Sequence, residues 1–218
     1  MNVVTIERKI LEKNDEVARQ NRALFEKSHV FTINLLSSPG SGKTSLLECV
    51  LEELKGRLNI AVIEGDVHTD LDAQRVARYG VPVVQIVTHG GCHLEAKLVQ
   101  DALTHLPLQE TQVLFIENVG NLVCPANYDL GEARKVVVIS TTEGEDKPLK
   151  YPAMFRNSHI LIINKIDLLP HLSLRLEDLK RNALDVNPSL RVFETSCVTN
   201  EGIREVCDWL LGQDSSKS

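Results

Sequence analysis

The 218-residue chain lacks an excess of basic residues and any long apolar run. Acidic residues outnumber basic ones by 30 to 24, and the net charge of −6 argues against nucleic acid as the main partner. No apolar stretch reaches the length of a membrane span, and the N-terminus does not have the form of a signal peptide. We therefore expect a cytoplasmic protein whose partners are neither membranes nor nucleic acids.

Closely spaced cysteine pairs and histidine runs are also absent from the sequence. The five cysteines are an odd number and lie far apart, which favours free thiols in a reducing compartment over a disulfide framework. Some of these thiols are then available as metal ligands. At 218 residues, the chain is long enough for one large α/β domain and too short for two.

Apolar, β-prone runs alternate with amphipathic stretches along the sequence. This alternation predicts an α/β fold with a mainly parallel sheet covered by helices on both faces and ligands at the carboxyl ends of the strands. The expected strands are 30–36, 59–64, 81–87, 113–117, 135–140, 159–163 and 190–195, and the expected helices are 43–55, 71–79, 94–106, 172–186 and 201–211. An amphipathic helix within 1–28 precedes the core domain of 29–212, and 213–218 is expected to be a disordered tail.

A loop of small residues joins the first expected strand to its helix. In such a loop the backbone N–H groups point inward and the helix N-terminus adds partial positive charge, so that a di- or triphosphate is bound. Lys43 would reach the β and γ phosphates, and Thr44 would coordinate Mg²⁺. Ser37 stands where the usual motif has its first glycine. The residues predicted to bind the phosphates are Ser38, Gly40, Ser41, Gly42, Lys43, Thr44 and Ser45.

Two later loops indicate a guanine nucleotide. A tetrapeptide of sequence N-K-I-D follows an apolar strand, and its carboxylate, Asp167, can accept the N1–H and 2-amino groups of guanine, which adenine does not offer. Lys165 would lie over the base, and Asn164 would tie this loop to the phosphate loop. After the next strand, Ser196 and Cys197 are placed to contact the guanine edge through backbone amides. The expected ligand is therefore GTP or GDP.

A switch-like segment follows the fourth expected strand. Glu117 occupies the place of the acidic residue that holds Mg²⁺ through water, and the N–H of Gly120 can bond the γ-phosphate. Asp66 and Asp72 are candidates for the other Mg²⁺-side switch, although a turn or a helix N-cap explains them equally well. No obvious glutamine follows Gly120 to orient water, so we expect slow GTP hydrolysis, with Lys43, Asp66, Glu117 and Gly120 as the catalytic residues.

Soft metal ligands occur in two further loops. Cys92 and His93 directly precede a helix, and Cys124 lies shortly after the switch glycine. Thiolate and imidazole suit Ni²⁺, Zn²⁺ or copper, but the spacing is not that of a zinc finger, and ordinary thiols stay an equal alternative. Three ligands leave a four-coordinate ion short, and a second chain across a two-fold axis would complete it. Cys49 and Cys207 occupy helical positions typical of core packing.

Taken together, these motifs resemble those of the HypB family, the GTPases that help to insert nickel into [NiFe]-hydrogenase. The segments that carry the resemblance are 37–44, 91–96, 117–125 and 143–148, and the similarity extends from the N-terminal helix to about residue 211. A serine at position 37 is normal for that family. The resemblance implies a P-loop NTPase fold of the SIMIBI type.

The resemblance also implies a nucleotide-dependent homodimer with Ni²⁺ or Zn²⁺ at its interface, held by Cys92, His93 and Cys124. Its expected partners are a second nickel-binding accessory protein and the hydrogenase large-subunit precursor. Some members carry an N-terminal cysteine motif or histidine-rich stretch for nickel storage, and this sequence has neither. The implied function is that of a GTP-hydrolysing metallochaperone with GTP or GDP, Mg²⁺, and Ni²⁺ or Zn²⁺ as cofactors.

Three other functions stay open. The urease-accessory nickel GTPases resemble this chain in the nucleotide loops but typically carry a Cys-Pro-His motif, which is not found here. A P-loop kinase acting on a small molecule is disfavoured by the N-K-I-D tetrapeptide and by the lack of an evident lid. A metal sensor or carrier with incidental hydrolysis would lose metal but keep GTP when Cys92 or Cys124 is mutated, whereas a kinase would be indifferent.

Overall fold

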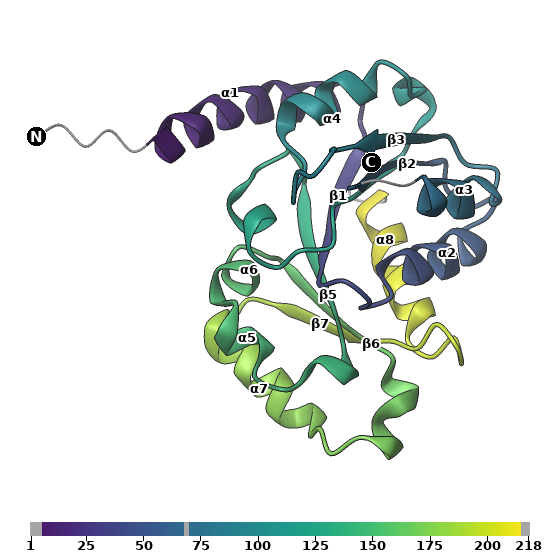
Figure 1. The fold of residues 1–218 in the computed structure, drawn as a ribbon. Helices are drawn as coiled ribbons and strands as arrows, with labels where there is room; N and C mark the ends of the chain where they lie inside the picture. The colour runs from purple at the N-terminus through teal and green to yellow at the C-terminus, as the bar shows by residue number, and fades with distance from the viewer. Residues whose placement is uncertain (1–5, 68–69, 215–218) are drawn as a thin grey trace, which may run out of the picture.

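The computed structural model of the chain describes residues 6–67 and 70–214. A seven-stranded sheet has the order β3-β2-β4-β1-β5-β6-β7, and every neighbouring pair is parallel (Figure 1). The strands are β1 (Phe31–Ser37), β2 (Ile60–Asp66), β3 (Val83–Val87), β4 (Val113–Glu117), β5 (Arg134–Ser140), β6 (Ile160–Asn164) and β7 (Arg191–Glu194). The predicted α/β fold with a parallel sheet is confirmed.

Helices cover both faces of this sheet (Figure 1). They are α1 (Ile6–Lys27), α2 (Lys43–Glu53), α3 (Leu71–Ala77), α4 (Ala96–Leu103), α5 (Lys147–Lys150), α6 (Pro152–Arg156), α7 (Leu176–Val186) and α8 (Ile203–Asp214). Buried side chains of α2, α3 and α8 pack on one face, and those of α1, α4, α6 and α7 pack on the other. The expected tail begins inside α8, and its residues 215–218 lie outside the described ones.

The central strands are apolar on both faces because both faces are covered. In β2, Val62 belongs to the cluster beneath α2 and α8, while the next residue, Ile63, belongs to the cluster beneath α1 and α4. Phe115 and Ile116 of β4 alternate in the same way. Because successive side chains point to opposite faces, one continuous apolar run contributes to both cores. The same alternation decides to which face each polar residue at a strand end points.

The N-terminal helix α1 is hydrogen-bonded to the rest of the structure through two buried asparagines. Asn14 donates to the carbonyl of Asp129 at 2.8 Å and accepts the N–H of Ala96, the first residue of α4, at 2.8 Å. Asn21 donates to the carbonyls of Ala96 and Leu130 at 2.9 and 3.1 Å. These bonds hold α1 against the start of α4, which directly follows the loop with the predicted metal ligands.

Several element boundaries differ from the sequence expectation by a few residues, and α5 and α6 were not predicted. Each of these two helices is about one turn long and carries a proline in its first turn, Pro148 or Pro152, so neither produces a helical period in the sequence. Over the described ranges, no helix combines the length and apolar character needed to cross a bilayer.

Candidate nucleotide and metal sites

A cavity of about 580 Å³ surrounds the predicted phosphate loop at the carboxyl ends of β1, β2 and β4. The structure brings most of the predicted nucleotide and Mg²⁺ residues together here. The predicted residues that line the cavity are Ser38, Gly40, Ser41, Gly42, Lys43, Thr44, Ser45, Asp66, Asp72, Glu117, Gly120 and Lys165. A polar cavity at this edge of a parallel sheet is where ligands bind in open α/β folds.

The shape of the phosphate loop depends on Gly42, the residue before α2. Its φ of +88° lies in the left-handed region, and a Cβ at this position would lie 2.5 Å from the Nδ2 atom of Asn164. The backbone of the loop is thus free to approach the guanine loop closely. On the other side, the hydroxyl of Ser38 donates to the carboxylate of Glu143. Glu143 belongs to the motif at 143–148, and this contact gives that motif a place beside the nucleotide cavity.

Glu117 connects the two side chains that were predicted to serve phosphate and Mg²⁺. The ammonium of Lys43 lies 2.5 Å from Oε1 of Glu117, and the hydroxyl of Thr44 donates to the same oxygen at 2.6 Å. Lys43 is 9% exposed and Glu117 only 1%. Within the described part of the chain, the other oxygen of Glu117, Oε2, has no hydrogen-bond partner. A buried lysine, hydroxyl and carboxylate therefore converge at the base of the cavity.

A second buried carboxyl group, that of Glu64, lies beside Glu117 and was not predicted. The two residues are opposite each other in the β2–β4 register, and Glu64 is 2% exposed. Burial, followed by the charge of Glu117, raises the pKa of Glu64 to about 10. Glu64 is then neutral at pH 7 and can donate a hydrogen bond to Glu117. No local motif signals this pair, because it arises from the pairing of two strands that are not consecutive.

The two aspartates predicted for the Mg²⁺ side both line the cavity. Asp72 pairs with the guanidinium of Arg75 at 3.0 Å, and Arg75 also contacts Glu48 at 2.5 Å and the hydroxyl of Ser45 at 3.1 Å. Asp72 does not cap α3, since Asp70 precedes that helix. Residues 68 and 69 of the predicted loop lie outside the described residues. With Thr44 and Glu117, the two aspartates line one cavity with oxygen atoms, the ligand type that Mg²⁺ prefers.

The predicted guanine loop lies directly against the phosphate loop. Asn164 donates to the carbonyl of Ser41 at 3.0 Å, as expected, and the ammonium of Lys165 donates to the carbonyl of Gly40 at 2.7 Å. The hydroxyl of Ser196 donates to Oδ1 of Asp167 at 2.6 Å. The loop after β7 therefore orients the carboxylate that was predicted to recognise guanine.

The predicted soft ligands also come together. One ligand atom from each of Cys92, His93 and Cys124 lies within 4.8 Å of the others, and Sγ of Cys92 is 3.6 Å from Nδ1 of His93. The ring of His93 packs on Tyr128 with centroids 3.9 Å apart. Among the described residues, no group hydrogen-bonds the buried Nε2 of His93, although a carboxylate oxygen of Glu95 lies 4.0 Å away.

The ionisation of the soft ligands fits a metal site. Burial lowers the pKa of His93, which keeps its imidazole neutral and able to coordinate. The neighbouring thiol of Cys124 raises the pKa of Cys92, because the two sulfur atoms share one proton more readily than they hold two negative charges. A soft divalent cation would remove that restraint by binding both thiolates.

One buried side chain, Asn118, links the metal loop to the nucleotide cavity. It follows Glu117 directly, and its Oδ1 accepts the N–H of Leu94 at 3.0 Å and that of Val119 at 3.0 Å. Its Nδ2 donates to Oδ1 of Asn34 on β1 at 3.3 Å. The start of the switch segment and the residue after His93 thus share one acceptor atom. Sequence reasoning placed Asn118 in the switch motif but did not predict this contact.

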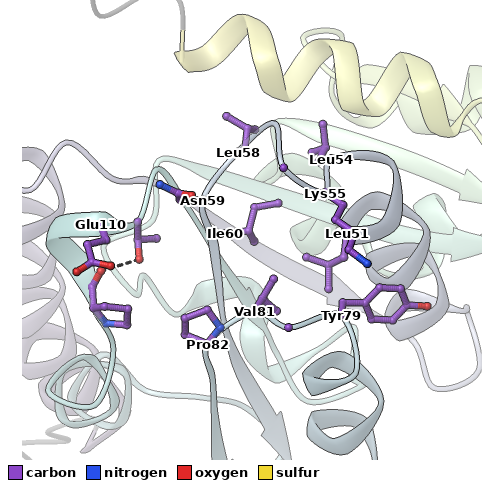
Figure 2. Close-up of a pocket in the computed structure, with 14 residues that line it drawn as sticks. Leu51, Leu54, Lys55, Leu58, Asn59, Ile60, Tyr79, Val81, Pro82 and Glu110 are labelled. Atoms are coloured by element: carbon purple, nitrogen blue, oxygen red, sulfur yellow. Dashed lines mark hydrogen bonds between the residues drawn. The ribbon is translucent and has the colours of Figure 1, made fainter.

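A different cavity, of about 480 Å³, lies near the amino ends of β2 and β3. Figure 2 shows its lining, in which Lys55 and Tyr79 lie on one side and Pro82 and Glu110 on the other. It contains none of the predicted site residues. Its place at the opposite ends of the strands separates it from the nucleotide motifs.

Comparison with known proteins agrees with the geometry. Residues 31–194 match the family model described as the CobW/HypB/UreG nucleotide-binding domain. The hydrogenase maturation factor HypB of Rhizobium leguminosarum bv. viciae is 52% identical over 208 residues, which cover 95% of this chain and 70% of the relative. That of Escherichia coli strain K12 is 48% identical over 211 residues, which cover 97% and 73%.

Comparison with solved structures identifies the same group of proteins. The crystal structure of HypB from Helicobacter pylori in complex with nickel matches with a TM-score of 0.89 and 36% sequence identity. The match covers 94% of this chain and 96% of that one. The expected SIMIBI-type P-loop NTPase fold is confirmed by such neighbours. This chain therefore belongs to the CobW/HypB/UreG family and, within it, to the HypB hydrogenase maturation factors.

Proposed function

We propose that this chain is a slow GTPase and metallochaperone that binds Ni²⁺, or Zn²⁺, at a homodimer interface during [NiFe]-hydrogenase maturation. Its proposed partners are a second nickel-binding accessory protein and the hydrogenase large-subunit precursor. The five cysteines are free thiols, which fits the reducing cytoplasm as its proposed compartment. A H. pylori relative was solved in complex with nickel, which favours nickel as the metal.

The observation that carries this proposal is the gathering of Cys92, His93 and Cys124 within 4.8 Å, next to the switch segment. Kinases and other nucleotide-binding enzymes have no need of two thiols and an imidazole at this place. Asn118 joins the loop of these ligands to the strand that ends in Glu117. Val123, beside Cys124, is 61% exposed, and an apolar residue exposed next to an incomplete ligand set favours a second copy of the chain as its cover.

In the nucleotide site, the proposed roles are supported by the contacts and the cavity lining described above. Lys43 bears the positive charge for the β and γ phosphates, Thr44 and Glu117 supply oxygens for Mg²⁺, and Asp66 or Asp72 completes that side. Mg²⁺, when bound, neutralises phosphate charge. Gly120 lines the cavity next to the phosphate loop, where an added Cβ would lie 3.4 Å from Pro39, and its N–H is the proposed partner of the γ-phosphate. We infer that Asn164, Lys165 and Asp167, with Ser196 and Cys197, select guanine.

A nickel titration of the purified protein with GDP and with a non-hydrolysable GTP analogue tests the proposal. Metal stoichiometry and oligomer mass are recorded together for the wild type, Cys92→Ala and Cys124→Ala. We expect thiol-dependent binding that differs between the two nucleotides, with a larger mass in the analogue. Alanine variants that bind nickel like the wild type would remove the metal assignment, and loss of metal without any nucleotide effect would favour a simple carrier.

A further inference from the structure

Two cysteines outside the metal cluster meet where helix α2 passes the loop after β7. Cys49 and Cys197 are 148 residues apart in the sequence, yet Sγ of Cys49 lies 3.9 Å from the carbonyl oxygen of Cys197. Each of the two thiols also shifts the pKa of the other, as expected of neighbouring sulfur atoms. Both side chains are half-buried, and both line one surface cavity of about 720 Å³. Packing alone, the role predicted for Cys49, does not account for a thiol pair that faces a cavity.

The pair has the unequal reactivity of a dithiol poised for exchange. The neighbouring thiol of Cys197 lowers the pKa of Cys49 to about 7, against the opposing effects of burial and of Glu48. Cys49 is thus partly a thiolate at neutral pH, and the thiolate is the nucleophilic form. Burial and neighbouring acidic side chains raise the pKa of Cys207 to about 12 and leave that cysteine unreactive.

Cys197 belongs to the loop that orients the guanine-recognising carboxylate. Its Sγ lies 3.5 Å from Oδ1 of Asn164, the residue that holds the guanine loop to Ser41. The preceding residue, Ser196, donates to Asp167 at 2.6 Å. A covalent bond on Cys197 would remove its thiol hydrogen from Asn164 and restrain the backbone that carries Ser196.

We propose that Cys49 and Cys197 form a reversible disulfide that joins α2 to the guanine loop and weakens guanine-nucleotide binding. Low-molecular-weight disulfides such as oxidised glutathione are the oxidant. The formation of the disulfide does not depend on the proposed function, whereas its effect on nucleotide binding rests on the proposed guanine-nucleotide site. Disulfides of proteins in reducing compartments are typically transient and redox-sensing, which is the role assigned to this one.

The reaction proceeds by two thiol–disulfide exchanges. The Cys49 thiolate attacks one sulfur of oxidised glutathione, which breaks its S–S bond, forms a mixed disulfide on Cys49 and releases one glutathione thiolate. Cys197 then loses its thiol proton to solvent, attacks the Cys49 sulfur and expels the second glutathione. Two cysteine thiols are oxidised, one glutathione disulfide is reduced to two thiols, and a thiol reductant reverses both steps.

The test treats the full chain with oxidised glutathione at neutral pH, blocks the remaining thiols and maps disulfides by mass spectrometry. GDP affinity is measured on the oxidised and reduced protein. We expect a Cys49–Cys197 cross-link and GDP binding weakened about tenfold, equivalent to one or two lost hydrogen bonds, with recovery on reduction. Cys49→Ser should bind GDP normally when reduced and lose the response to oxidant, whereas Cys207→Ser should respond like the wild type.

Peptide mapping separates this pair from Cys92 and Cys124, whose ligand atoms also lie close together. A cross-link confined to those two, no cross-link at all, or a Cys49–Cys197 bond without any change in GDP affinity would overturn the proposal. If instead the reduced protein does not bind GDP, the proposed nucleotide function is wrong. The disulfide mapping then still shows whether Cys49 and Cys197 form a cross-link.

Discussion

Glu64 is a buried carboxyl group whose ionisation should make the stability of the protein depend on pH. Its pKa is raised from 4.5 to about 10, so folding disfavours its charged form. Below about pH 4.5 this carboxyl group is neutral in both the folded and the unfolded protein. As the pH rises from 4.5 toward 10, the unfolded protein is favoured because only there can the group ionise, and the free energy of unfolding falls. Glu64→Gln keeps a neutral hydrogen-bond donor beside Glu117 and removes that titration.

We therefore expect Glu64→Gln to melt above the wild type at pH 8 by at least about 3 °C, with the difference shrinking toward pH 5. Thermal unfolding of the nucleotide-free protein across that range measures the difference. Glu205→Gln, which changes an exposed carboxyl group on α8, serves as the control and should follow the wild type. A constant difference between Glu64→Gln and the wild type at all pH values would contradict the assigned ionisation.

Asp167 is the side chain on which the choice of nucleotide should depend. Asp167→Asn removes a charged acceptor of two hydrogen bonds, so GDP affinity should fall about 100-fold or more. The new amide can donate to the 2-oxygen of xanthine, and XDP should then bind better than GDP. Titration with both nucleotides measures this change in preference. Asp185→Asn, an exposed aspartate on α7, should alter neither affinity; equal GDP binding by the wild type and Asp167→Asn would reject guanine selection by Asp167.

At the scale of whole elements, α1 should behave as part of the folded core. Gly131, with a φ of +91°, lies so close to α1 that a Cβ would be 2.7 Å from the carbonyl oxygen of Ala18 and 2.8 Å from the N–H nitrogen of Arg22. Both backbone strain and a clash with α1 thus oppose any side chain there. We expect Gly131→Ala to lower the free energy of unfolding by about 2–4 kcal/mol.

Gly56→Ala is the matched control, since Gly56 has a φ of +72° and no heavy atom within 4 Å of an added Cβ. This change introduces only the backbone strain and should cost about 1 kcal/mol. Chemical denaturation of both variants isolates the clash with α1 as the difference. Equal losses in the two variants would mean that α1 moves away freely and does not stabilise the domain.

The helices and strands could be predicted where a single segment contains the signal. The apolar run of β4 ends in Glu117 and Asn118, and its predicted and observed bounds coincide at 113–117. The phosphate-loop helix starts at residue 43 as predicted but ends at Glu53 instead of 55, a difference of the size usual at helix ends. One-turn helices such as α5 contain too few residues to show a period.

Contacts between segments could not be predicted, because sequence order does not reveal strand order. Glu64 lies beside Glu117 only because β4 inserts between β1 and β2. Cys49 meets Cys197 for a similar reason, since α2 and α8 share one face of the sheet and bring the loop before α8 next to α2. Cys92 and Cys124 were expected to be metal ligands from the chemistry of their side chains, whereas the short distance between them results from the fold.

For the molecule as a whole, metal and nucleotide should affect each other through Asn118. Its Oδ1 holds the N–H groups of Leu94 and Val119 together, so movement of the switch segment is passed to the loop with the metal ligands. We expect Asn118→Ala to bring the nickel affinities measured with GDP and with a GTP analogue to nearly the same value. Leaving two buried N–H groups unpaired should also lower stability by about 1–3 kcal/mol.

Asn187→Ala separates lost coupling from lost stability. Asn187 is buried after α7 and donates to the carbonyls of Phe155 and Ser158 at 3.0 Å each, at the opposite ends of the strands from the nucleotide cavity. It should destabilise the protein to a similar degree and keep the nucleotide effect on nickel binding. Because coupling is reciprocal, nickel should shift the affinity for the GTP analogue in the wild type by the same factor, and in Asn118→Ala by almost none. If Asn118→Ala keeps the full factor in both titrations, the two sites communicate by another route, and the shared acceptor at Asn118 serves only to hold the loops together.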